Sequence, residues 1–94
     1  MNRLLHDGRP VRRPDVWLRE ADSENALCDP SSGAVHFLNP TALAIWNLCD
    51  GQTTAMEMIR AICELSGFDE EVVAEDVTRT LDTFERTGVI TWKS

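Results

Sequence analysis

The 94-residue chain has no run of apolar residues that approaches the roughly 18 needed to cross a membrane as a helix. Its N-terminal segment lacks the apolar region and the small-residue cleavage site of a signal peptide. Neither end carries a lipidation motif. With 43% hydrophobic and 27% charged residues, the composition is that of a globular protein. These observations predict a single domain over residues 1–94, located in the cytoplasm and without a membrane partner.

The chain also lacks the residue patterns of most catalytic and metal sites. Cys28, Cys49 and Cys63 are 21 and 14 residues apart, without the paired spacing of a zinc site or a disulfide framework. Each lies in an apolar run, which predicts buried, reduced thiols. Cys28 and His36 could meet across a hairpin, but no third residue that would orient such a pair is signalled. The sequence therefore predicts a protein that is not an enzyme and holds no cofactor or metal ion.

The hydrophobic pattern divides the chain near Asn39, with a period close to two before it and a helical period after it. Residues 1–14 are predicted to form an irregular arm that becomes extended near Val11. Residues 15–38 are predicted to form a three-stranded antiparallel meander, because the connections between the strands are short and polar. The predicted strands are 15–21, 26–29 and 34–38. In a meander of this kind the first and third strands are edges.

Residues 39–94 are predicted to form three helices, over 40–49, 54–66 and 69–87, followed by a short strand near 89–92. Asn39-Pro40 is typical of a helix start, Thr54 and Glu57 form a capping box, and Asp69 is expected to cap the third helix. Trp46 falls on the apolar face of the first helix and is expected to be buried. The order predicts an α+β fold that is similar to a winged helix-turn-helix.

Basic residues are scarce, with 9 of them against 16 acidic ones for a net charge of −7. Residues 69–87 alone contain seven acids and two arginines. Proteins gain most of their affinity for nucleic acids by neutralising phosphates, and winged-helix DNA readers place a basic helix in the major groove. The charge distribution therefore argues against a nucleic-acid partner.

Five short pieces occur in a specific order along the chain: Asp29-Pro30-Ser31-Ser32-Gly33, Phe37-Leu38-Asn39-Pro40-Thr41-Ala42, Ile45-Trp46-x-Leu48, Asp50-Gly51-x-Thr53 and Asp76-Val77…Leu81…Gly88-Val89-Ile90. In this order and spacing, the segment from Leu27 to Ile90 resembles the PqqD family of small peptide chaperones, also called RiPP recognition elements. The junction over residues 38–46 looks more like that of stand-alone relatives than that of the branch dedicated to pyrroloquinoline quinone.

The resemblance implies a non-catalytic chaperone that binds the leader segment of a ribosomally made precursor peptide. It implies that the leader adds a strand to the third strand, in a cleft against the third helix. A modifying enzyme, often a radical-SAM enzyme, then acts on the precursor. On this basis the expected peptide-binding residues are Val35, His36, Phe37, Leu38, Val73, Asp76, Val77 and Thr80.

The residues of the third strand support strand addition independently. Residues 34–38 contain neither a charge nor a proline that would block pairing at an exposed edge. Five residues span roughly 16 Å, which suits a short peptide strand. A proline at His36 is expected to weaken binding if the His36 N–H points outward. Two alternatives remain: the arm or the second subunit of a homodimer covers this edge, or the chain is a winged-helix adaptor or transcription factor.

Overall fold

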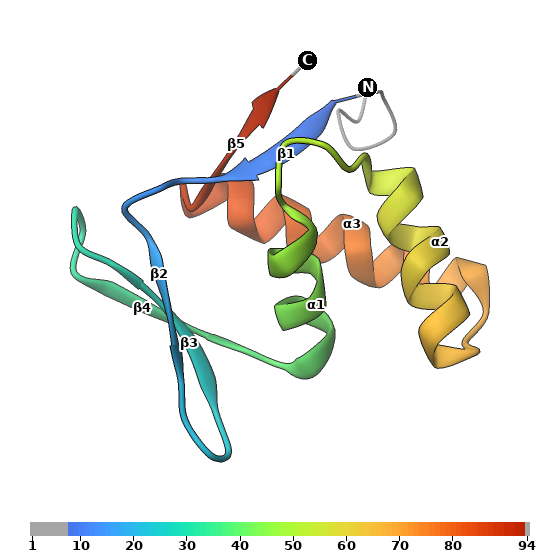
Figure 1. Cartoon of the computed structure of the whole chain (residues 1–94), viewed down its shortest axis with the longest axis horizontal. Helices are drawn as coiled ribbons and strands as arrows, with labels where there is room; N and C mark the ends of the chain where they lie inside the picture. Colours follow the sequence, from blue (N-terminus) through green and yellow to red (C-terminus); the bar gives the residue numbers. More distant parts are fainter. Residues whose placement is uncertain (1–7, 94) are drawn as a thin grey trace.

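The structure, a computed structural model, describes residues 8–93 and has an α+β fold (Figure 1). Its larger sheet is antiparallel with the strand order β2–β3–β4, formed by β2 (Trp17–Glu20), β3 (Asn25–Asp29) and β4 (Ala34–Leu38). This is the meander predicted over 15–38, with a first strand shorter than predicted. Both β2 and β4 are edge strands of this sheet.

A second sheet, which the sequence did not predict, joins the two ends of the described chain. It pairs β1 (Arg9–Arg12) with β5 (Ile90–Lys93) in antiparallel orientation. The predicted irregular arm over 1–14 is therefore wrong for residues 9–12, although the extension near Val11 is confirmed. The pairing joins residues about 80 positions apart, so no local periodicity could reveal it. The rest of the arm, residues 1–7, lies outside the described residues.

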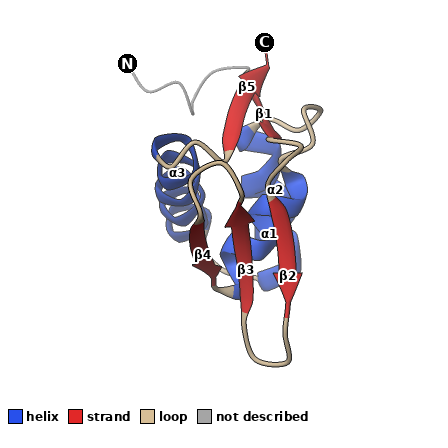
Figure 2. Cartoon of the chain, turned by 90° about the vertical axis from the view of Figure 1, so that its left-hand side faces the viewer, coloured by secondary structure: helices blue, strands red, loops and turns tan. Residues whose placement is uncertain are grey.

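The three helices begin and end within one residue of the predicted positions. They are α1 (Pro40–Leu48), α2 (Ala55–Ser66) and α3 (Glu70–Arg86). The Asn39 side chain accepts a hydrogen bond from the Ala42 N–H at 2.8 Å, and the predicted capping box of α2 is present. Asp69 occupies the N-cap position of α3, but its side chain makes no capping hydrogen bond, contrary to the prediction. Figure 2 shows the larger sheet with its β4 edge beside α3.

The core lies where the helices meet the inner face of the larger sheet. Trp46 is 3% exposed, and its ring packs edge-to-face on Phe84 with the ring centroids 5.7 Å apart. Leu27 of β3, Val73 and Val77 are also buried in this cluster. The predicted burial of Trp46 is confirmed. The packing places α3 against the sheet at the β4 edge.

Candidate functional site

The backbone groups of β4 point in directions that follow from the turn between β2 and β3. The Ala21 N–H donates to the Glu24 carbonyl at 2.9 Å, so these two residues form a hydrogen-bonded pair. Hydrogen-bonded and non-hydrogen-bonded pairs alternate in an antiparallel ladder. Along the β2–β3 register this alternation makes Leu18 and Leu27 a non-hydrogen-bonded pair. The backbone groups of Leu27 therefore point away from β2 and toward His36, its partner in β4.

The same alternation directs the N–H and C=O groups of Val35 and Phe37 away from β3. No strand within residues 8–93 pairs with this outer side of β4. The edge therefore offers two N–H donors and two C=O acceptors to an added strand. The N–H of His36 points inward, toward β3, so a proline at His36 would disrupt the ladder itself. The outward donors belong to Val35 and Phe37.

A groove of about 220 Å³ lies between β4 and α3. Its walls come from both elements and from Ala42 of α1, with these residues lining it: His36, Phe37, Leu38, Ala42, Arg79, Thr80, Thr83, Phe84 and Thr87. The hydroxyls of Thr83 and Thr87 donate to the carbonyls of Arg79 and Thr83 at 3.0 and 2.8 Å. These hydroxyls therefore face a peptide as hydrogen-bond acceptors. The groove therefore presents mainly apolar and hydroxyl-bearing walls beside an unpaired strand edge.

Most of the predicted binding residues lie at this groove or at its rim. His36, Phe37, Leu38 and Thr80 line it, and the exposed Val35 belongs to the open edge.

Asp76 lies one helical turn before Thr80 and pairs with the Arg79 guanidinium. Neither Asp76 nor Val35 lines the groove itself. Because the acid is only partly buried, its charge can act on a peptide that runs past this turn of α3.

Val73 and Val77, also predicted to contact the peptide, do not line this groove. They are 2% and 0% exposed and belong to the core. The spacing of apolar residues placed them on α3 without showing which side of the helix is open. Ala42, Phe84 and Thr87 line the groove but were not among the predicted residues. The sequence did contain one signal for this wall of the groove. Thr80, Thr83 and Thr87 are three and four residues apart, so their hydroxyl-bearing side chains share one face of a helix.

Arg13 links the end of β3 to the residue after the C-cap of α3. Its guanidinium donates to the Asp29 carboxylate at 3.1 Å and to the Gly88 carbonyl at 2.9 Å. Asp29 ends β3 and Gly88 follows α3, so this side chain bridges the β3–β4 turn and the end of α3. The Ser31 hydroxyl and N–H, with Arg13, lower the pKa of Asp29 to about 2 despite its burial. A charged Asp29 therefore accepts from Arg13, which also contacts the residue after the C-cap of α3.

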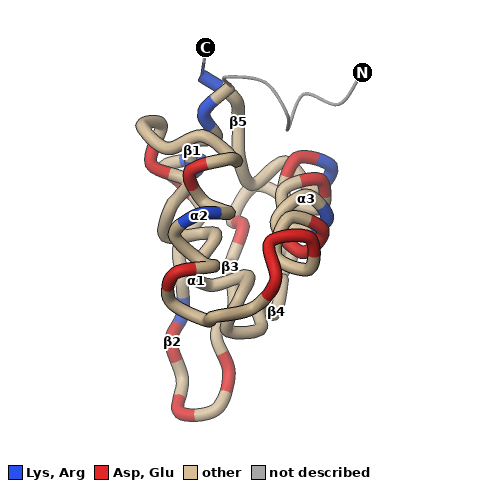
Figure 3. Tube along the Cα trace, turned by 90° about the vertical axis from the view of Figure 1, so that its right-hand side faces the viewer, with Lys and Arg blue, Asp and Glu red and all other residues tan. Residues whose placement is uncertain are grey.

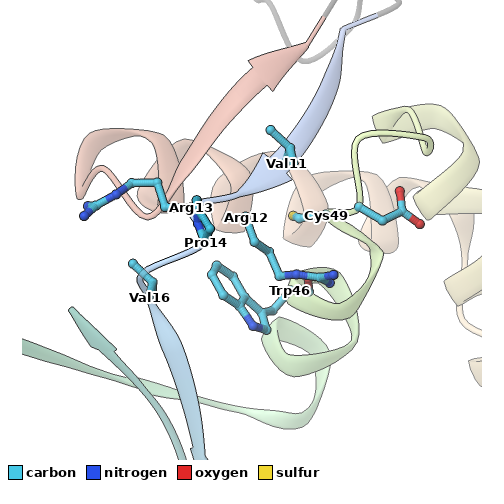
Figure 4. A pocket seen from close by; sticks show the side chains of 8 residues that line it. Val11, Arg12, Arg13, Pro14, Val16, Trp46 and Cys49 are labelled. Atoms are coloured by element: carbon cyan, nitrogen blue, oxygen red, sulfur yellow. The ribbon is translucent and has the colours of Figure 1, made fainter. Parts of the chain in front are cut away.

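A second hollow of about 310 Å³ lies between the bend after β1 and the end of α1 (Figure 4). Arg12 in its wall already donates to the carbonyls of Trp46 and Asn47 at 3.1 and 2.9 Å. Cys49 is fully buried there, and burial raises the pKa of its thiol to about 12. A thiol that stays protonated is a poor nucleophile. Neither Arg12 nor Cys49 is therefore a reactive group in this hollow.

The remaining candidate chemical groups are also separated. Cys28 pairs in register with Val35, one position away from His36, so the Cys28 and His36 side chains lie on opposite faces of the sheet. They cannot form the nucleophile–base pair considered from the sequence. Cys28 and Cys63 are only half-buried, whereas Cys49 is buried as predicted. Within residues 8–93, no group of three or more His, Cys, Asp or Glu residues could hold a metal ion, and no helix could span a membrane.

Acidic residues outnumber basic ones along α3 (Figure 3). The helix carries six acids and two arginines. Both arginines pair with acids of the same helix: Arg79 with Glu75 and Asp76, and Arg86 with Asp82. This surface would repel the phosphates of a nucleic acid.

Comparison with known families shows to which family this chain belongs. The sequence model of the family described as "Coenzyme PQQ synthesis protein D (PqqD)" matches residues 24–90. This chain belongs to the PqqD family. The matched region contains β4, α3 and every residue that lines the groove, whereas β1 lies outside it.

Among solved structures, the PqqD-family chain is similar to one described as "TbiB1 in Complex with the TbiA(beta) Leader Peptide". The TM-score is 0.74 and the sequence identity is 21%, with 85% of this chain and 93% of that chain covered. At this identity the likeness shows a shared fold. No curated protein matches this chain.

Proposed function

We propose that this PqqD-family protein binds the leader segment of a ribosomally made precursor peptide and presents it to a modifying enzyme. The observation that carries the proposal is the open edge of β4 beside the groove. Val35 and Phe37 offer unpaired backbone groups there, and α3 supplies a wall for side chains. Main-chain pairing gives affinity in this mode of recognition, and side-chain pockets give specificity.

Two findings from the comparisons support this assignment. The chain belongs to a family named for the synthesis of a coenzyme, and it shares its fold with a protein that was solved with a leader peptide. The chemistry of the chain agrees with a binding role, because its fully buried thiol is protonated and its Cys28 and His36 lie on opposite faces of the sheet. In this proposal the covalent chemistry belongs to a separate enzyme, of which the radical-SAM class is our first candidate.

In the proposal, α3 serves as a wall of the groove. A winged-helix adaptor or transcription factor is less well supported, because the exposed surface of α3 is acidic. The proposal also places the protein in the cytoplasm, where ribosomes make the precursor. In this proposal the leader pairs with the β4 edge, so a second subunit of a homodimer does not cover it.

The test is amide-shift mapping by nuclear magnetic resonance, with the cognate leader peptide added to the protein. We expect perturbed amides in residues 34–38 and in the part of α3 that lines the groove, Arg79–Thr87. If the perturbed amides avoid both 34–38 and 72–87, strand addition is wrong. A labelled DNA duplex at low salt is the control for the alternative function, since phosphate-driven affinity is strongest there. We expect no binding of the duplex.

A further inference from the structure

The outer face of the larger sheet is unusually apolar for a surface that no other element within residues 8–93 covers. In an antiparallel sheet with one face on the core, the other face normally carries polar residues. Here the outward positions hold one charged residue among six: Trp17, Arg19, Ala26, Cys28, Val35 and Phe37. Trp17, Val35 and Phe37 are 53%, 48% and 63% exposed. This face therefore presents large side chains that lack a partner within the described chain.

The apolar row on this face runs directly to the open edge. Trp17, Cys28 and Val35 are neighbours in register across the three strands, and Phe37 is the next outward residue along β4. The row thus ends on the two residues whose backbone groups await an added strand. Because the row is continuous with that edge, we expect the added strand itself to cover Val35 and Phe37.

The geometry of strand addition fixes where the side chains of that strand lie. Side chains alternate between the two faces of a sheet, and neighbours at the same level lie on the same face in both parallel and antiparallel pairs. Peptide residues level with Val35 and Phe37 must therefore project onto the outer, apolar face. The residue level with His36 must project onto the inner face, into the groove beside Thr80 and Phe84.

We propose that the protein reads the leader on both faces of the added strand. This inference rests on the proposed function and adds a requirement to it. The bound segment carries three consecutive apolar residues: the middle one enters the groove, and the two flanking ones pack against Val35 and Phe37 on the outer face. A segment that alternates apolar and polar residues would fill the groove but leave the outer face without its partner. Phe37, which also borders the groove, is then a specificity-determining residue at an outward position of the sheet.

The size of the effect follows from cross-strand pairing. Aromatic and β-branched neighbours on one face of a sheet stabilise it by about 0.2–1 kcal/mol per pair, which corresponds to about a 1.5- to fivefold change in affinity. Removing the Phe37 ring should therefore lower the affinity for a peptide with three consecutive apolar residues by up to about fivefold. It should leave unchanged the affinity of a segment whose outward residues are serine.

The experiment is selection of binders from a displayed library of random twelve-residue peptides, followed by amide-shift mapping of the selected peptides. We expect enrichment of three consecutive apolar residues, with shifted amides at residues 34–38. Selected peptides that shift these amides but alternate apolar and polar residues would overturn the inference and leave the proposed function standing. Selected peptides that leave residues 34–38 unshifted would contradict the proposed function as well.

A double-mutant cycle tests the outer face directly. The protein change is Phe37→Ser, and the peptide change replaces its outward apolar residue with serine. We expect the two losses of affinity to be coupled, so that Phe37→Ser no longer matters once the peptide residue is serine. Trp17→Ser is the matched control, because Trp17 lies on the same face but two strands from the edge. Additive losses, or an equal loss from Trp17→Ser, would show that the peptide does not pack against Phe37.

Discussion

At the scale of single residues, Trp46 has the largest expected effect on stability. Its side chain is 3% exposed and packs edge-to-face on Phe84. We expect Trp46→Ala to lower the free energy of unfolding by about 3–5 kcal/mol, as truncation of a buried aromatic does. Urea denaturation measures this loss. Trp17→Ala is the matched control, since Trp17 is 53% exposed and should cost far less. Equal losses from the two changes would contradict the burial of Trp46.

The Asp29 carboxylate makes stability depend on pH in a definite direction. Hydrogen bonds from Ser31 and from Arg13 hold its pKa at about 2, below the ordinary value of 3.8. A carboxyl group with a lowered folded-state pKa stabilises the fold above its unfolded pKa, and that stability is lost as the pH falls toward 2. We therefore expect Asp29→Asn to destabilise the protein at pH 7 and to differ little from wild type near pH 2.

Urea denaturation at pH 7, 4 and 2 measures this difference, with Asp82→Asn as the control. Asp82 pairs with Arg86 on the exposed side of α3, where an ion pair contributes little. A gap between wild type and Asp29→Asn that stays constant down to pH 2 would mean that the carboxylate of Asp29 is not the stabilising group. The pH range of interest, from about 4 to 2, follows from the two pKa values of Asp29.

At the scale of single elements, β4 supports a prediction that separates folding from binding. The N–H of Val35 points toward the open edge, whereas that of His36 points toward β3. Val35→Pro should therefore keep the melting temperature close to that of the wild type while weakening leader binding, since edge strands tolerate proline. His36→Pro should lower the melting temperature, because it removes a donor of the β3–β4 ladder. The opposite pattern would show that the backbone alternation assigned to β4 is wrong.

Elements that depend on local sequence could be predicted, and those that depend on distant pairing could not. Residues 34–38 have no charge and β-favouring side chains, and they form a strand with the predicted ends. The strand over Arg9–Arg12 pairs with Ile90–Lys93, far away in the sequence, and no local pattern indicated this pairing. The strand side of the groove could be predicted because it depends on the local sequence of residues 34–38. On α3 the apolar spacing identified Val73 and Val77, but their burial depends on how α2 and α3 pack.

At the scale of the whole molecule, charge supports a prediction about which peptides bind. The chain has a net charge of −7, and α3, which forms one wall of the groove, carries six acids. Asp76 lies one turn before Thr80 and pairs with Arg79, and both of these residues line the groove. We expect Asp76→Lys to weaken binding of a peptide flanked by lysines and to strengthen binding of the same peptide flanked by glutamates.

The measurement is fluorescence anisotropy of the two peptides at low and high salt. Charges near the surface are screened beyond about 10 Å at 0.1 M salt, so both effects should shrink as salt is added. Asp82→Lys is the control, because it makes the same change of charge on a face of α3 that does not line the groove. If Asp76→Lys and Asp82→Lys act equally, the peptide senses only the net charge of the molecule. A larger effect at Asp76 places the peptide beside the middle of α3, as strand addition to β4 requires.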